Sequence, residues 1–111
     1  MKARYIQRGD SIDFIPTADV AAGDIVKLGS LVGVSKLDIR AGELGALALV
    51  GVYEIATNGT AIAAGAVVLV DPGTGKVCDP GAAGAVKFGH AIGAAAATDT
   101  LVLVRLEQGL A

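Results

Sequence analysis

The sequence predicts an all-β protein, a small single-domain β-barrel or β-sandwich built from short hairpins, with at most one short helix. Apolar residues fall in short runs rich in Val, Ile and Leu, and Gly, Asp, Asn and Pro separate these runs. Apolar residues keep a helical spacing over no long stretch. A chain of 111 residues can bury one modest core. We therefore expect an N-terminal arm over residues 1–10 and a single β domain over residues 11–111.

The first strands are expected between residues 11 and 35. Residues 11–15 alternate apolar and polar side chains, and Pro16 then removes a backbone donor, which favours an edge strand. Residues 24–28 and 31–35 flank Gly29-Ser30, a two-residue connection typical of a hairpin.

The rest of the chain predicts further strands. Residues 44–55 form a long apolar run that predicts one strand covered on both faces. Asn58-Gly59 predicts a turn, and a second hairpin is expected from residues 67–70 and 76–78. The remaining strands are expected at residues 86–92 and 101–106, the latter central in its sheet, and residues 94–97 form a turn or one short helical piece.

One short internal echo is present. Residues 21–26, Ala-Ala-Gly-Asp-Ile-Val, resemble residues 63–68, Ala-Ala-Gly-Ala-Val-Val, and in each case a glycine turn leads into a β-branched strand. Duplication and an unrelated pair of glycine-initiated strands both account for this echo.

Charge and cysteine content exclude several classes of protein. Nine Lys and Arg against eleven Asp and Glu give a net charge of −2, which argues against binding to nucleic acid or to an anionic membrane. A single cysteine, Cys78, excludes an intrachain disulfide and a metal site made of several thiolates. No secretory signal and no membrane span of about 20 apolar residues is evident, so we expect a soluble protein made in the cytoplasm.

The chain carries no recognisable catalytic constellation, so we expect no enzyme, no cofactor and no metal. His90 is the sole histidine and is expected at a strand edge or an interface, while Cys78 is expected to be a packing residue. Residues 73–76, Gly-Thr-Gly-Lys, lack the first glycine and the following Ser or Thr of a phosphate-binding loop, and they predict a hairpin turn. The strings at residues 8–10 and 58–60 are likewise interpreted as turns. Most acidic residues are expected to cap turns and strand ends.

The composition also predicts association. Aromatic residues make up only 4% of the chain and Trp is absent, so the core is thin and an oligomer would complete it. Lys2, Arg4 and Arg8 crowd the start of the chain together with Tyr5. This segment is either an arm that docks on an acidic partner or a solvated terminus.

Several short segments, taken in order, carry a resemblance over nearly the whole chain. They are Tyr5 with residues 9–12, then residues 22–26, 29–34, 41–43, 51–54, 64–68, 75–77, 89–93 and 101–106. In this order they resemble a family of bacteriophage capsid decoration (cement) proteins, formerly catalogued as an uncharacterised phage family or as "possible recombinases".

The resemblance implies a structural protein of the virion, made in the host bacterium. It would bind the outer surface of the major capsid protein lattice and stabilise the head, as a homo-oligomer with a trimer favoured. Lys2, Arg4, Tyr5 and Arg8 are the residues expected to contact the capsid or a neighbouring subunit.

Three alternatives remain from the residues. Residues 20–31 are similar to the first hairpin of biotinyl or lipoyl carrier barrels, but Lys36 lies at the wrong distance for the modified lysine and lacks its usual neighbours. The second alternative is an enzyme of the recombinase type, which would need a nucleotide site that the chain lacks. A further small β binding module of another kind is also compatible with the composition.

Overall fold

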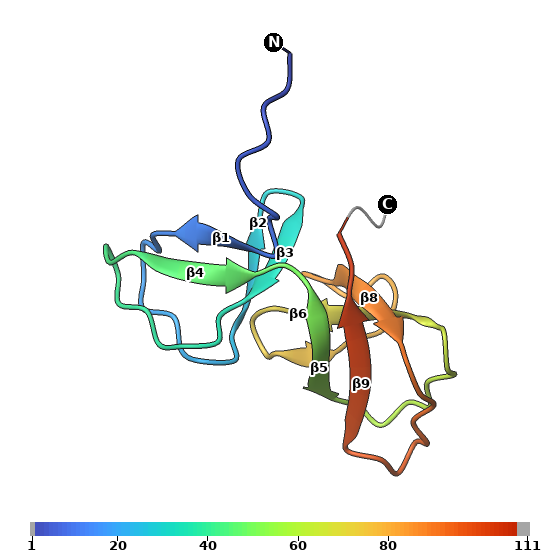
Figure 1. Ribbon diagram of the computed structural model, residues 1–111. Coiled ribbons are helices and arrows are strands. Elements are labelled where there is room, and N and C mark those ends of the chain that lie inside the picture. The colour runs from blue at the N-terminus through green and yellow to red at the C-terminus, as the bar shows by residue number, and fades with distance from the viewer. Residues whose placement is uncertain (1, 109–111) are drawn as a thin grey trace.

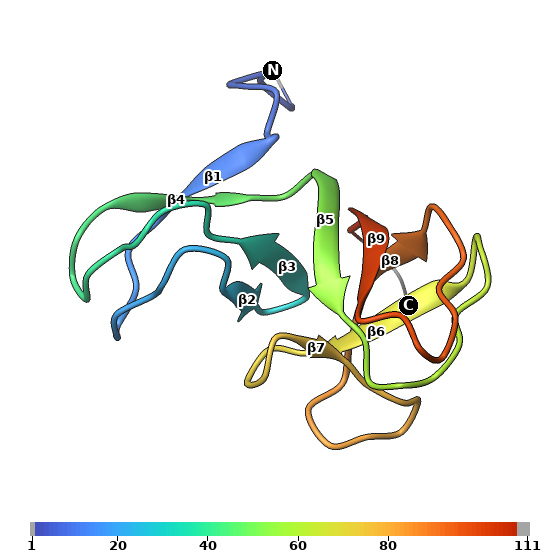
Figure 2. The ribbon, with the colours of Figure 1, turned by 90° about the horizontal axis from the view of Figure 1, so that it is seen from below.

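The computed structural model describes residues 2–108 and confirms the predicted all-β class, with nine strands and no helix among these residues. Met1 and residues 109–111, which belong to the predicted arm and domain, lie outside the described residues. The strands form a four-stranded sheet and a closed five-stranded barrel, which lie side by side (Figures 1 and 2). No helix that could cross a membrane occurs between residues 2 and 108.

The four-stranded sheet contains the first part of the chain. Its strands are β1 (Ser11–Phe14), β2 (Ile25–Leu28), β3 (Leu31–Val34) and β4 (Gly45–Ala48), in the order β1-β4-β3-β2. The prediction of an edge strand at residues 11–15 is therefore confirmed. So is the first hairpin, in which Leu28 pairs with Leu31 and Gly29 takes a φ of 61°.

The barrel contains β5 (Gly51–Ala56), β6 (Val67–Asp71), β7 (Lys76–Val77), β8 (Val86–Ala91) and β9 (Leu101–Leu106). Its order is β5-β7-β6-β8-β9, and β9 closes the barrel by pairing with β5 over the full length of both strands. The predicted second hairpin is β6-β7, and β9 lies between β5 and β8 as predicted. Residues 94–97 contain no helix; Ala95 instead forms an isolated bridge with Ile62.

The prediction of one long strand over residues 44–55 is wrong. This run is divided into β4 and β5, which belong to different sheets. The change of direction lies at Gly51, whose φ of 125° is strained for other residues. The ring of Tyr53 packs over this glycine, where an added Cβ would lie 3.3 Å away, and the Tyr53 hydroxyl donates to the Val50 carbonyl at 2.9 Å. Hydrophobicity alone does not reveal such a break, because both halves are apolar.

Two turns before β2 and β4 bind each other reciprocally, and we call them the paired turns. They are residues 19–24 (Asp-Val-Ala-Ala-Gly-Asp) and residues 38–43 (Asp-Ile-Arg-Ala-Gly-Glu). Val20 and Ile39 exchange two backbone hydrogen bonds of 2.8 Å. The Asp38 carboxylate accepts from the Ala22 amide at 2.8 Å, and the Asp19 carboxylate accepts from the Ala41 amide at 2.9 Å. The symmetry of these bonds shows that the two turns form one unit.

The echo between residues 21–26 and 63–68 corresponds to a shared local structure. Gly23 and Asp24 exchange backbone hydrogen bonds with Ser35, and Gly65 and Ala66 exchange the same bonds with Ala91. Each bridge partner, at positions 39 and 95, follows four residues later. The same turn-and-bridge arrangement therefore precedes one strand in the sheet and one in the barrel, which the sequence echo could not establish.

The main core joins the two sheets. Phe88, Val70 and Val104 are fully buried in the barrel, and Ile25 and Val34 of the four-stranded sheet belong to the same cluster. Gln108, just after β9, binds both sheets together: its side chain accepts from the Val32 amide at 3.0 Å and donates to the carbonyls of Val32 at 2.5 Å and Leu49 at 3.2 Å. The amide group thus replaces a strand partner at this position.

Candidate interaction surfaces

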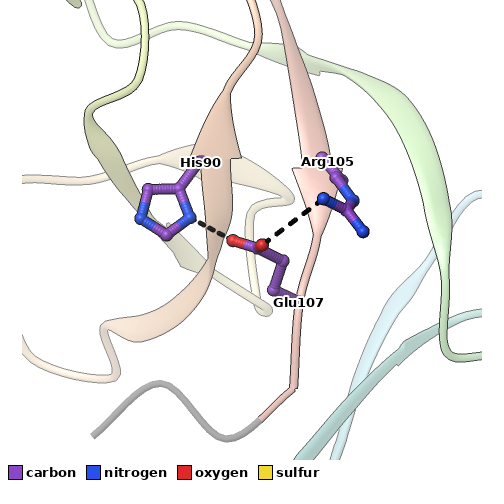
Figure 3. Close-up of polar contacts among 3 residues, drawn as sticks. All are labelled: His90, Arg105 and Glu107. Carbon is purple, nitrogen blue, oxygen red and sulfur yellow. Dashed lines mark hydrogen bonds and ion pairs between the residues drawn. The ribbon is translucent and has the colours of Figure 1, made fainter.

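One cluster of titratable side chains lies on the barrel wall (Figure 3). His90 on β8 contacts the Glu107 carboxylate through Nδ1, and Arg105 on β9 lies 3.8 Å from the same carboxylate. His90 and Arg105 are cross-strand neighbours, and Glu107 follows directly after β9. The Arg105 side chain is 68% exposed, so its ion pair with Glu107 lies at the surface.

This cluster has no nucleophile to activate. Neither Ser nor Cys shares a hydrogen bond with His90 within residues 2–108, and no group of three metal-ligating side chains is found in that range. His90 lies near the end of β8 and pairs with Val67 on one side and Arg105 on the other.

Cys78 is half-buried just after β7. Burial raises the pKa of the Cys78 thiol, and the negative charges of Asp71 and Asp79 raise this pKa further. A raised pKa leaves little thiolate at neutral pH, so Cys78 is poorly suited to nucleophilic chemistry. This agrees with the predicted packing role.

The segment that resembles a phosphate-binding loop is a turn, as predicted. Asp71 caps the segment 73–76: its carboxylate accepts from the Gly73 amide at 2.9 Å and its carbonyl from the Gly75 amide at 2.7 Å. Residues 8–10 lead into β1, with Arg8 and Asp10 paired at 3.7 Å. Lys36 lies in the segment between β3 and Ile39, whereas the tight hairpin turn is occupied by Gly29-Ser30. The position of Lys36 therefore gives the carrier alternative no further support.

Acidic residues cap backbone groups, as predicted for most of them. Asp24 accepts from the Ala21 amide at 2.9 Å and Asp99 from the Ala96 amide at 2.8 Å. Glu107 departs from this pattern because it binds His90 and Arg105.

The outer wall of the barrel exposes large apolar side chains between charged ones. Along β5 and β9 the exposed fractions are 50% for Val52, 51% for Leu101 and 44% for Leu103. Glu54 lies opposite Leu103, and Arg105 lies opposite Val52. The mixture of apolar and charged side chains on one wall is typical of a protein-binding surface.

A groove of about 340 Å³ lies beside the four-stranded sheet, and we call it the β1–β4 groove. Leu37 and Leu44 on its rim are 76% and 67% exposed. Its lining residues are Ser11, Lys36, Leu37, Asp38, Ile39, Glu43, Leu44, Gly45, Ala46 and Ala48. Its lining therefore includes Ser11 of the edge strand β1 and three residues of the second paired turn, Asp38, Ile39 and Glu43.

The predicted contact residues all lie in the segment before β1. Lys2, Arg4, Tyr5 and Arg8 are exposed, and Tyr5 is 78% exposed. This segment has no strand and runs away from the sheets (Figure 1). These four residues lie in one segment, and among residues 2–108 the one ion pair they form is that of Arg8 with Asp10.

The groove residues and the barrel wall were missed in the sequence. The alternation in β9 could have indicated the wall, since Leu101 and Leu103 are exposed while Val102 and Val104 are buried. For the groove, the similarity of residues 19–24 to residues 38–43 could have indicated that these two turns pair. Leu37 and Leu44 flank the second turn and could have indicated the apolar rim.

Fold and surfaces together define a small β protein whose exposed groups are suited to binding other proteins. The family described as phage cement protein matches residues 6–106, which is nearly the whole chain. The chain therefore belongs to the phage cement protein family, and a structural role associated with the phage capsid is what this family indicates. Neither the curated proteins nor the solved structures that were searched contain a match. Lys2, Arg4 and Tyr5 precede the matched residues, while Arg8 lies within them.

Proposed function

We propose that this protein binds the outer surface of the major capsid protein lattice and stabilises the phage head against internal pressure. The observation that carries the proposal is the match to the phage cement protein family over residues 6–106. The exposed apolar side chains on the barrel wall and around the β1–β4 groove support it, because they offer two separate contact surfaces. Contact with more than one capsid subunit would let several modest interfaces add through effective concentration.

The proposal includes an arm over residues 1–10, a single β domain over residues 11–111 and a homo-oligomer, with a trimer favoured. Lys2, Arg4, Tyr5 and Arg8 contact the capsid or a neighbouring subunit. The four-stranded sheet supports association, because β1 and β2 are open edges, whereas the barrel is closed. Covering such edges prevents uncontrolled strand pairing.

Cosedimentation with matched capsids tests this function. The protein should bind expanded shells in a saturable manner and bind unexpanded shells at least about tenfold more weakly, a difference of about 1.4 kcal/mol. Deleting residues 1–8 should weaken attachment while leaving the circular dichroism spectrum unchanged. Absence of binding to either shell would contradict the proposed function, and undiminished attachment of the truncated protein would contradict the role of the arm.

A further inference from the structure

The segment before β1 and the β1–β4 groove have complementary chemistry. Residues 2–9 contain Lys2, Arg4 and Arg8 and no acidic residue, with Tyr5 and Ile6 exposed between the cations. The groove combines exposed Leu37 and Leu44 with the carboxylates of Asp38 and Glu43, which outnumber its one cationic side chain, Lys36. A basic segment with an apolar centre thus matches an apolar groove with acidic side chains.

The two carboxylates differ in availability. Asp38 already accepts a hydrogen bond from the Ala22 amide within the paired turns. The Glu43 side chain is exposed and has no ion pair with any residue between 2 and 108. Glu43 is therefore the carboxylate that can receive a cation without loss of an internal bond.

The geometry of the chain favours a groove on another molecule. The segment leaves the body at Asp10 and runs away from its own sheets (Figure 1). Its eight residues span about 26 Å when extended, at about 3.3 Å per residue. The radius of gyration of 14.7 Å exceeds the roughly 13 Å expected for a compact chain of this length, in keeping with a segment that does not pack on its own body.

We propose that residues 2–9 of one copy lie in the β1–β4 groove of a second copy, with Tyr5 and Ile6 against Leu37 and Leu44 and Arg4 near Glu43. This inference rests on the proposed function only in its choice of a neighbouring copy as the partner of the arm. Ser11, the first residue of the edge strand β1, lines the groove, so an extended segment that lies there can also add backbone hydrogen bonds to β1.

A charge exchange between copies tests the proposal. Arg4→Glu places two negative charges together in every arm–groove contact, and Glu43→Arg places two positive charges together. Each variant alone should self-associate at least about fivefold more weakly than the unmodified protein in sedimentation velocity. An equimolar mixture should recover association, because each arm then meets a groove of opposite charge. Glu54→Arg on the barrel wall is the matched charge control: it keeps both Arg4 and Glu43, so this variant alone should self-associate like the unmodified protein.

A disulfide trap provides the second measurement. In a Cys78→Ser background, a Tyr5→Cys copy and a tagged Leu44→Cys copy should form a disulfide between them under mild oxidation. Leu28→Cys, at the exposed end of β2 and outside the lining of the groove, serves as the control partner and should cross-link at least about fivefold less. Because both cysteine positions are exposed, these substitutions leave the core intact.

The results separate this proposal from the capsid function. Any of three results would overturn arm exchange. They are a monomer at all concentrations, a mixture that behaves like its separate components, and a disulfide that forms within a single chain carrying both Tyr5→Cys and Leu44→Cys. Capsid cosedimentation of the unmodified protein is measured independently. If shells are bound and the mixture fails to recover, only arm exchange is wrong; if association recovers and no shell is bound, only the capsid function is wrong.

Discussion

Among the glycines between residues 2 and 108, Gly89 is the one where an added Cβ would come closest to another atom. It lies in β8 opposite Leu106, and a Cβ added there would lie 1.7 Å from the Arg105 carbonyl oxygen. That oxygen belongs to the backbone of β9, so the clash cannot be relieved by rotating a side chain. At Gly93, two residues after β8, an added Cβ meets nothing within 4 Å.

We predict that Gly89→Ala lowers the free energy of unfolding by at least about 2 kcal/mol, since β8 and β9 must separate to admit the methyl group. Gly93→Ala is the matched control and should change this free energy by no more than about 0.5 kcal/mol. Urea unfolding followed by circular dichroism measures both. Equal stability of the two variants would contradict the pairing of β8 with β9.

Cys78 offers a prediction that depends on pH. Because burial, Asp71 and Asp79 raise the thiol pKa, a smaller fraction of Cys78 is thiolate at any given pH than for an exposed cysteine. Alkylation by iodoacetamide should therefore be slow near neutral pH and should increase at a higher pH than for Ser30→Cys in a Cys78→Ser background. A Cys78 that reacts as fast as the exposed cysteine at neutral pH would refute this assignment.

At the scale of elements, the paired turns determine how β2 and β4 enter the sheet. Each turn uses an aspartate to accept an amide hydrogen bond from the other, Asp38 from Ala22 and Asp19 from Ala41. A short polar side chain at these positions can hold two chain segments together where the ladder provides only the Val20–Ile39 bridge.

We predict that Asp19→Ala and Asp38→Ala each lower the free energy of unfolding by about 1 kcal/mol, as expected for a partly exposed hydrogen bond. Asp38→Asn keeps an acceptor oxygen and should lose less than half as much. Asp13→Ala, on exposed β1, is the control and should be nearly neutral. Thermal unfolding provides the comparison, and an Asp38→Ala variant as stable as Asp13→Ala would show that the paired turns contribute nothing.

The comparison with the sequence shows which elements are encoded locally. The hairpins β2-β3 and β6-β7 were predicted because glycine turns and β-branched strands are adjacent in the chain. The break at Gly51 was not predicted, because it depends on Tyr53 packing over the glycine and on each half finding a different sheet. The pairing of residues 19–24 with 38–43 was likewise missed, since it joins turns that are separated in sequence.

At the scale of the whole molecule, Gln108 connects the barrel to the four-stranded sheet. Its side chain accepts from the Val32 amide and donates to two carbonyls, one of them on Leu49 just after β4. A side-chain amide can satisfy a strand residue in this way because it carries the same donor and acceptor groups as the backbone.

We predict that Gln108→Ala increases hydrogen exchange at the Val32 amide by about tenfold or more, which corresponds to about 1.4 kcal/mol of lost local stability. Gln7→Ala, in the exposed segment before β1, is the control and should leave this rate unchanged. Exchange measured by NMR resolves the single amide. An unaltered Val32 rate in the Gln108 variant would mean that the two sheets are held together by the apolar core alone.

The candidate surfaces were only partly predictable from the sequence. The basic segment with Lys2, Arg4, Tyr5 and Arg8 is contiguous, so its chemistry could be identified without a fold. The β1–β4 groove could not, because Ser11, Leu37 and Ala48 come together only after β1 pairs with β4 beside the paired turns. An apolar residue such as Leu44 appears in the sequence as a core residue, although it is 67% exposed.

We propose that this small β protein stabilises a phage shell by binding to its folded, expanded lattice. A ligand that binds only the folded state raises the unfolding transition in proportion to the logarithm of its concentration. Scanning calorimetry of expanded shells, with and without the protein, tests this most directly. We expect the shell transition to move to higher temperature as the protein concentration rises and then to change only slowly beyond saturation. A shell transition that stays at the same temperature at saturating protein would contradict stabilisation of the shell by this protein.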